Sequence, residues 1–457
     1  MGGVERWLGI PYARAARFAR PAPVAWDGDR SRVGTFGPAA PQAPGDDRVP
    51  GARVDVTDEE GCLSLNVWAP AGARSLPVLV WFHGGSFVLG SSSQPCYDGA
   101  RLAQEQSVVV VSANYRLGAL GFLDTRTIGG DVANLGVHDA LEALQWVQGN
   151  IAALGGNPER VTIFGESAGG GVATHLLASE AARGRFAGAI VQSGVTDRTL
   201  DADRAALVAR ALCDAAGADD LDALRALPVD AMIAAQTSVL PALLKPVGMM
   251  PFHPSIDDEL LDAPPAVALA RGAAAGVRLL AGTTSEEMNL FLDPRAPAID
   301  PDRLVARVGK YVGVSPAVAR DVVARYEAEV GPDSVWPALF SDVEMQVPLR
   351  RVLEAHAPHS PTYAYLFTWQ APKLGAVHAV DIPFTFDTFD VDGWGEFVGS
   401  DDEARAVGRA LRTAWAAFAR RDDPGWSQYP VTHVFGRESY DAPRHPLFFR
   451  QQDYWRA

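Results

Sequence analysis

One serine of this chain, Ser167, stands in the sequence GESAG at residues 165–169, between a β-branched run and a segment typical of a helix. A Gly-x-Ser-x-Gly turn in that setting is typical of a nucleophile elbow, in which a strained backbone lifts the serine hydroxyl to where a base can take its proton. Side chains at Gly165 and Gly169 would collide with neighbouring elements as the chain doubles back. The alternative is an ordinary glycine turn, which the flanking strand and helix disfavour.

The sequence HGGSF at residues 83–87 directly follows a predicted strand and offers a second chemical feature. Consecutive glycines at the carboxyl end of a strand leave backbone N–H groups free to point into a crevice and hold negative charge on an oxygen. Together with the N–H of Ala168, those of Gly85 and Ser86 would form an oxyanion hole. The alternative is a tight turn around a buried His83.

Both turns need a rigid sheet that brings them to one place, and the sequence predicts one. Continuous apolar runs at residues 77–82 and 107–112 are typical of strands buried on both faces of a mainly parallel sheet, and residues 161–164, 187–192 and 277–281 repeat the pattern. Apolar residues at helical spacing over residues 139–147 predict a helix between strands. This alternation predicts an α/β fold with a doubly wound central sheet.

Two regions depart from that alternation. Residues 199–235 and 300–329 are rich in alanine, arginine and aspartate at helical periodicity. We interpret them as parts of helical cap insertions, near residues 199–275 and 300–350, within a single domain that spans residues 1–457.

Composition excludes several classes of protein. The formal net charge of −15 opposes binding to nucleic acid or to anionic membranes, which require basic surfaces. The chain has no apolar run of about eighteen residues or more and no signal peptide at its start, so we expect a cytoplasmic protein. The three cysteines, Cys62, Cys96 and Cys213, are widely spaced, which fits a reducing compartment and excludes a disulfide framework or a cysteine zinc site.

Motifs along almost the whole chain resemble those of the type-B carboxylesterases, the family of bacterial para-nitrobenzyl esterases, animal carboxylesterases and cholinesterases. Besides the two turns above, they are LGIPYA (8–13), EGCLSLN (60–66), YDG (97–99), NYRLGALGF (114–122), NLG (134–136), GGNP (155–158) and QSG (192–194). The resemblance implies an α/β-hydrolase fold and hydrolysis of a small-molecule ester with water. It implies no metal and no organic cofactor.

The resemblance also implies the partners of Ser167, in the order serine, acid, histidine. The sequence GTTSEEMNLF at residues 282–291 resembles the family's Gly-Thr-x-x-Asp-Glu-Gly-x-x-Phe, which makes Glu287 the acid. Met288 stands where the family has glycine, and a shifted loop would leave Glu286 as the alternative. The sequence GAVHAVDIPF at residues 375–384 resembles Gly-x-x-His-x-x-Glu-Leu-Pro-Tyr, which makes His378 the general base.

A histidine base predicts a rate that rises through pH of about 6 to 7. Two other histidines, His356 and His359, stand three residues apart, a spacing found in metal sites. No third ligand is near, and we interpret them as members of a surface loop.

Several family features are altered. The cysteine that would bridge to Cys62 is absent, because residues 37–42 read GPAAPQ, so that disulfide cannot form. The chain starts close to the LGIPYA motif, so we expect the opening strands of typical members to be largely missing. Glu60 and Arg116 match a buried charged pair of the family, the alternative being two unrelated surface charges.

Substrate preference is the least determined property. The loop of residues 43–59 is short, polar and without an apolar lid, so we expect esters of short to medium acyl chain. The candidate pocket residues are Phe87, Leu89, Phe252, Phe291 and Phe384. Thioesters, lactones, carbamates and anilides are chemically close alternatives. A non-catalytic adhesion protein on the same fold is a further alternative, which the presence of the serine, acid and histidine disfavours.

Overall fold

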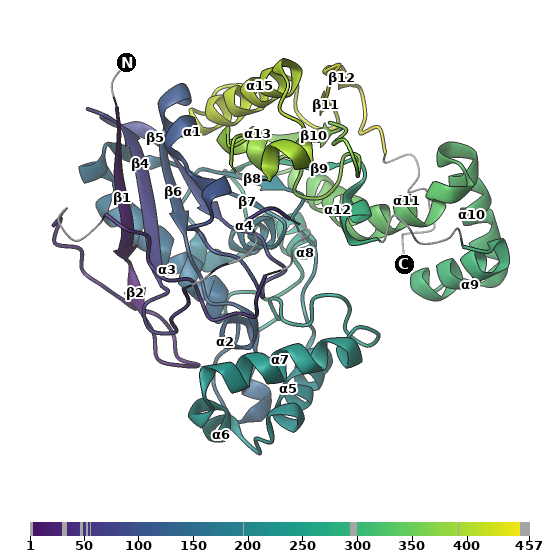
Figure 1. The fold of residues 1–457 in the computed structure, drawn as a ribbon, viewed down its shortest axis with the longest axis horizontal. Helices are drawn as coiled ribbons and strands as arrows, with labels where there is room; N and C mark the ends of the chain where they lie inside the picture. The colour runs from purple at the N-terminus through teal and green to yellow at the C-terminus, as the bar shows by residue number, and fades with distance from the viewer. Residues whose placement is uncertain are drawn as a thin grey trace.

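The computed structural model describes residues 3–29, 34–45, 49–51, 54, 56–194, 196–292, 299–391 and 393–447. Its centre is a ten-stranded sheet in the order β1-β4-β6-β5-β7-β8-β9-β10-β11-β12 (Figure 1). Neighbouring strands run parallel from β6 to β11, and only the edges, β1-β4-β6 and β11-β12, are antiparallel. The strands are β1 (Val4–Pro11), β4 (Ser64–Pro70), β5 (Leu76–Phe82), β6 (Val109–Ala113), β7 (Gly156–Glu166), β8 (Gly188–Gln192), β9 (Arg278–Thr284), β10 (Thr362–Phe367), β11 (Thr432–Phe435) and β12 (Tyr440–Ala442).

The predicted fold class is confirmed. The five apolar runs correspond to β5, β6, β7, β8 and β9, and their residues are almost all buried because helices cover both faces of the sheet. The LGIPYA motif lies mostly in β1, which forms the edge of the sheet beside β4. A short pair, β2 (Ala13–Arg14) and β3 (Ala22–Pro23), follows it.

Alternate residues of β5 divide the interior into two cores. Val78 and Val80 pack with α3 (Leu135–Asn150) and α4 (Ala168–Ala178) on one face. Leu79 and Trp81 pack with α1 (Ala100–Gln106) and α15 (Asp402–Ala419) on the other. This is the alternation expected of a strand buried on both sides, and it holds the ends of the strands in fixed positions.

The two regions outside the strand-helix alternation are helical, as predicted. The first contains α5 (Ala202–Ala216), α6 (Leu221–Ala226), α7 (Val229–Leu243) and α8 (Pro265–Ala270). The second contains α9 (Pro301–Val312), α10 (Pro316–Val330) and α11 (Val335–Ser341), then a π-helical turn, η8 (Asp342–Gln346), and α12 (Val347–His356). In Figure 1, α9 and α10 lie far from the sheet, and with α11 they enclose a small apolar core of their own.

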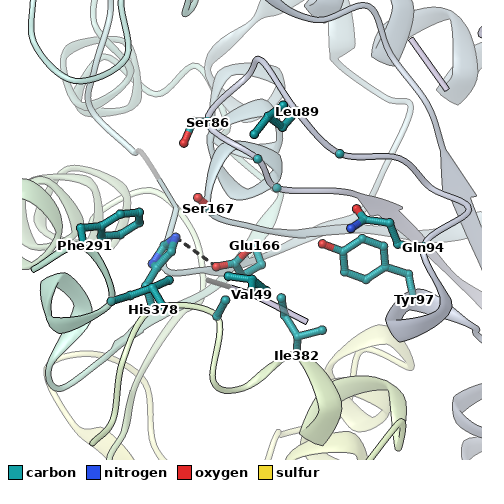
Figure 2. Close-up of a pocket in the computed structure, with 15 residues that line it drawn as sticks. Val49, Ser86, Leu89, Gln94, Tyr97, Glu166, Ser167, Phe291, His378 and Ile382 are labelled. Atoms are coloured by element: carbon teal, nitrogen blue, oxygen red, sulfur yellow. Dashed lines mark ion pairs between the residues drawn. The ribbon is translucent and has the colours of Figure 1, made fainter. Parts of the chain in front are cut away.

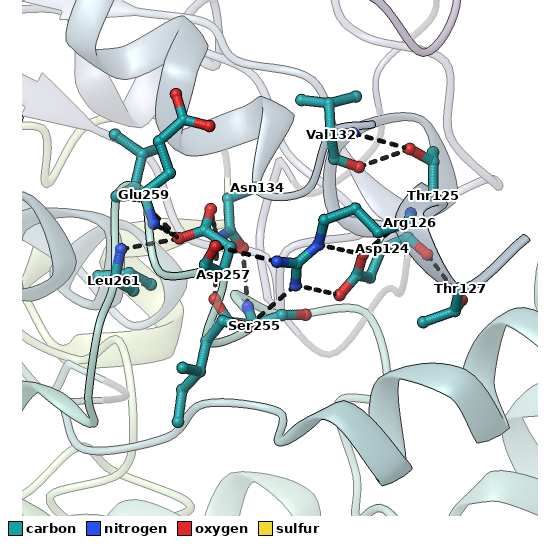
Figure 3. Close-up of polar contacts among 12 residues, drawn as sticks. Asp124, Thr125, Arg126, Thr127, Val132, Asn134, Ser255, Asp257, Glu259 and Leu261 are labelled. Atoms are coloured by element: carbon teal, nitrogen blue, oxygen red, sulfur yellow. Dashed lines mark hydrogen bonds and ion pairs between the residues drawn. The ribbon is translucent and has the colours of Figure 1, made fainter. Parts of the chain in front are cut away.

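The segment between α7 and α8 is fastened to the sheet's helical layer by polar contacts (Figure 3). The side chain of Asn134, at the start of α3, accepts from the N–H of Ser255 at 2.7 Å and donates to its carbonyl at 2.8 Å. The guanidinium of Arg126 donates to the carbonyls of Ile256 and Asp257. These contacts fix a segment that, as described below, borders the site.

The predicted pairing of Glu60 with Arg116 is wrong. Arg116 pairs with Asp139 at 2.7 Å, and these side chains are only 4% and 0% exposed. Glu60 is exposed, whereas its neighbour Glu59 pairs with Arg17 at 2.6 Å. Arg116 is thus buried as expected, but its partner comes from α3, which follows it in the chain.

The predicted absence of a disulfide at Cys62 is confirmed, because Cys62, Cys96 and Cys213 are all free and buried. No helix among the described residues is both long and apolar enough to span a bilayer.

Candidate active site

The candidate residues follow five strands that are neighbours in the sheet, β5, β7, β8, β9 and β10. The turn at residues 83–87 follows β5, Ser167 follows β7, Ser193 follows β8, Glu287 lies just after β9, and His378 comes after β10 and a loop. Since parallel strands end at the same edge of a sheet, these segments meet there. Figure 2 shows Ser167 and His378 at one cavity at this edge.

Ser167 has the strained backbone of the predicted elbow. Its φ is 56° and its ψ −121°, immediately before the first residue of α4. A Cβ atom on Gly169 would lie 1.9 Å from the carbonyl oxygen of Phe82, and one on Gly165 would lie 2.4 Å from the carbonyl carbon of Gly169. The steric reason given above for both glycines is therefore confirmed.

His378 makes its shortest contact with Glu287. Nδ1 of the imidazole lies 2.5 Å from Oε2 of the carboxylate, whose residue is fully buried. The other oxygen, Oε1, accepts from the hydroxyl of Ser193 at 2.5 Å and from the N–H of Thr284 at 2.7 Å. Three donors thus hold the carboxylate in a single orientation.

The neighbouring glutamate faces elsewhere. Oε2 of Glu286 accepts from the N–H of Ala376 at 2.7 Å. Met288 donates its N–H to Ser341 at 3.0 Å and does not shift the preceding residue away from His378. Of the two glutamates, the structure therefore places Glu287 on the imidazole.

A second carboxylate reaches the other nitrogen of the ring. Oε1 of Glu166 lies 3.2 Å from Nε2 of His378, an ion-pair contact marked in Figure 2. Burial would lower the pKa of His378, but the carboxylates of Glu166 and Glu287 outweigh burial and raise it to about 9. Burial also raises the pKa of Glu166 well above its usual range. Within the described structure, no hydrogen bond joins the Ser167 hydroxyl to His378.

The turn after β5 presents N–H groups to the same cavity. Gly85 and Ser86 have positive φ values, 112° and 55°. In the part of the chain that the structure describes, the N–H groups of Gly85, Ser86 and Ala168 donate no hydrogen bond. His83 is buried and stacked on Tyr115, as in the alternative of a tight turn around a buried histidine. The same turn nevertheless leaves N–H donors free, so the two interpretations are compatible.

Two cavities border Ser167 and His378. The first, of about 170 Å³, includes Leu89 and Phe291, as predicted for the pocket. The second, of about 300 Å³, also includes Phe291. The other predicted pocket residues, Phe87, Phe252 and Phe384, line neither cavity, because each is fully buried in the apolar cores.

The interpretation of His356 as a loop residue is wrong. It is the buried last residue of α12, and its Nδ1 lies 2.7 Å from the hydroxyl of Thr362. His359 is exposed, and its Nε2 lies 3.0 Å from the carbonyl of Ala270.

Comparison with known proteins gives the family. A model described as "Carboxylesterase family" matches residues 1–440. The chain is 34% identical to the para-nitrobenzyl esterase of Bacillus subtilis (strain 168) over 455 residues, which cover 96% of this chain and 91% of the relative. The chain belongs to the type-B carboxylesterase family. It is a carboxylic ester hydrolase, and the non-catalytic alternative is set aside.

Two further relatives, both bacterial, are similar to this carboxylesterase over nearly the whole chain. It is 34% identical to the phenmedipham hydrolase of Pseudarthrobacter oxydans, over 95% of this chain and 90% of the relative. The crystal structure of a Geobacillus stearothermophilus carboxylesterase at pH 6.2 matches with a TM-score of 0.85 and 34% identity, covering 99% and 96% of the two chains.

Several residues of the carboxylesterase site escaped the sequence analysis. Glu166 was only a variable position of GESAG, although a charged residue at the end of a buried strand is a signal in itself. Gln192 donates to Oδ2 of Asp381 at 2.8 Å, and burial raises the pKa of Asp381 to about 6. Other side chains of the first cavity come from separate segments, some of them helical: Val49, Gln94, Tyr97 and Ile382.

Proposed function

We propose that this carboxylesterase hydrolyses esters with Ser167 as nucleophile, His378 as general base and Glu287 as the acid that orients the base. The observation that carries the proposal is the 2.5 Å contact between Nδ1 of His378 and Glu287, on a ring that borders the same cavity as Ser167. A proton held on Nδ1 by the carboxylate leaves Nε2 free to accept a proton.

The proposed reaction has two stages, acylation of Ser167 and hydrolysis of the acyl-enzyme. As Oγ of Ser167 attacks the ester carbonyl, Nε2 of His378 takes the hydroxyl proton, and Glu287 stabilises the imidazolium that forms. The carbonyl oxygen becomes negative and accepts from the N–H groups of Gly85, Ser86 and Ala168. His378 then gives the proton to the leaving alcohol. Water, activated by the same imidazole, attacks the acyl-enzyme and releases the carboxylic acid.

The substrates that we propose are neutral esters of short to medium acyl chain. The support is the limited size of the two cavities that Ser167 borders, about 170 and 300 Å³. The names of the relatives, para-nitrobenzyl esterase and phenmedipham hydrolase, make para-nitrobenzyl esters and phenmedipham the first compounds to test.

A turnover assay tests the proposal. Para-nitrophenyl esters of graded acyl length should be hydrolysed by the wild type, with kcat falling by about five to six orders of magnitude in Ser167→Ala. Ser179→Ala is the matched control, because Ser179 is a buried serine just beyond the other end of α4. A Ser167→Ala enzyme that keeps more than a few per cent of the wild-type rate would contradict the assignment.

A further inference from the structure

The second cavity beside Ser167 is unusual in composition. Four of the chain's six methionines, Met249, Met250, Met288 and Met345, line it. We call it the methionine pocket. Since Ser167 and His378 also border it, a group bound there would be one of the two arms attached to the reacting ester.

The four methionines come from three segments that are each held in place. The carbonyl of Met250 contacts Nδ1 of the buried His253, just before the part of the segment that Asn134 and Arg126 fasten. Met345 belongs to the π-helical turn η8, whose last residue, Gln346, hydrogen-bonds to Thr283 and Thr284 at the end of β9. The walls are therefore anchored, while the side chains that face the cavity are flexible thioethers.

Met288 lies between the acid, Glu287, and the second helical region. It directly follows Glu287, is 2% exposed, and packs with Phe340 and Met345. The motif that the chain resembles has glycine at this position, so the side chain of Met288 fills space that a glycine would leave open beside the pocket.

The chemistry of the lining favours an uncharged, flexible group. Thioether chains are apolar, polarizable and able to repack around an unbranched alkyl chain. The single carboxylate at the wall, Glu344, accepts hydrogen bonds from Arg198 and Tyr311, so its charge is compensated within the protein.

From these contacts we propose that the methionine pocket takes the longer, unbranched apolar arm of the ester and that Met288 limits the length of that arm. This inference rests on the function proposed above. The other arm lies in the first cavity, beside Gln94, Tyr97 and Glu166. The acyl chain and the alkyl chain of the alcohol share the chemistry that the pocket recognises, so the experiment must separate them.

Two series of substrates separate the arms. Para-nitrophenyl esters from acetate to decanoate vary the acyl arm, and alkyl acetates from ethyl to octyl vary the alcohol arm, all below their solubility limits. In Met288→Gly, the ratio of kcat/KM for the longest over the shortest member should rise by about tenfold or more in one series, because each added methylene that finds an apolar site contributes roughly fourfold. The series that responds identifies the arm.

Three variants complete the test. Met288→Leu keeps the volume and should leave both ratios within about twofold of the wild type. Met232→Ala removes a fully buried methionine of α7 outside both cavities and controls for general destabilisation. Should Met288→Gly fail to fold, Met345→Ala removes the side chain that packs against Met288, enlarges the same part of the pocket and should shift the ratio in the same direction.

Failure of this inference differs from failure of the proposed function. If the wild type hydrolyses these esters but neither ratio moves in the enlarged variants, or if Met288→Leu moves them as much as Met288→Gly, the role of the methionine pocket is overturned. If the wild type hydrolyses no ester of either series, the proposed function is overturned as well.

Discussion

Oε1 of Glu166 lies 3.2 Å from Nε2 of His378, and Oε2 of Glu287 lies 2.5 Å from Nδ1, so the buried imidazole has a carboxylate at each nitrogen. Both carboxylates favour the charged ring, and together they outweigh the effect of burial on its pKa. Glu166 thus disfavours the neutral form of His378, which is the form that acts as base. Glu287 has the same effect but also orients the imidazole ring.

This arrangement predicts an unusually alkaline pH profile. Because only the neutral imidazole accepts a proton, and its pKa is raised to about 9, kcat/KM should rise with pH toward a midpoint near that value. The expectation of a rise through pH of about 6 to 7 assumed an unperturbed histidine and is replaced. Measurement of kcat/KM against pH with a slow ester gives the midpoint.

The variant Glu166→Gln tests whether the carboxylate of Glu166 raises the pKa of His378. Removing this anion while keeping the shape of the side chain should lower the midpoint by about one pH unit or more, because the imidazolium loses the strongest of its stabilising charges, the others being Glu287 and Asp381. A wild-type midpoint between pH 6 and 7 that stays in place in Glu166→Gln would contradict the coupling of these two residues.

The adjacent glutamates should differ sharply in effect. Glu287→Gln should lower kcat by about 10⁴-fold, because the amide no longer stabilises the imidazolium or fixes its tautomer. Glu286→Gln should change kcat by less than about threefold, since the amide oxygen can still accept from Ala376. The kcat of each variant is measured with para-nitrophenyl acetate, and melting curves control for folding. Equal losses, or a larger loss at Glu286, would contradict the assignment.

The pairing of Arg116 with Asp139 predicts a stability difference. Asp139→Ala should lower the free energy of unfolding by about 3–5 kcal/mol, because it leaves a buried guanidinium without its charge partner. Glu60→Ala should change it by less than about 0.5 kcal/mol, because Glu60 is exposed. Urea denaturation of the two variants checks both values, and the reverse order would restore the pairing expected from the sequence.

Substrate physical state offers a further prediction. The proposed preference for soluble esters implies that the rate follows the concentration of dissolved substrate and shows no jump when an emulsion forms. Titration of tributyrin through its solubility limit tests this. A sharp rise at that limit would show interfacial activation and contradict the proposal.

The sequence predicted the sheet's centre better than its edges. The runs that correspond to β5, β6, β7, β8 and β9 are mostly apolar, because helices bury both faces, and that pattern is visible in the sequence. The strands β1, β4, β10, β11 and β12 were missed. Strands near the edges mix polar and apolar residues and depend on partners that are distant in the chain, and β10, although buried, contains a threonine and two tyrosines.

The candidate site was predictable where a motif fixes the backbone. A Cβ atom on Gly165 or Gly169 would clash with the backbone, at 2.4 Å and 1.9 Å respectively, so the motif specifies the geometry around Ser167 by itself. By contrast, the contacts of Glu166 and Ser193 depend on the pairing of two strands. Glu166 of β7 lies opposite Gln192 of β8, which places Ser193 at the site, and no local pattern specifies this register. The same holds for the methionine pocket, which is assembled from three separate segments.

Covalent labelling identifies the nucleophile of this carboxylesterase. A fluorophosphonate that reacts only with an activated serine should add once per chain, and peptide mass spectrometry should place the adduct on Ser167. Ser179→Ala should label as the wild type does, and Ser167→Ala should not label at all. An adduct on any other residue, or equal labelling of Ser167→Ala, would contradict the account.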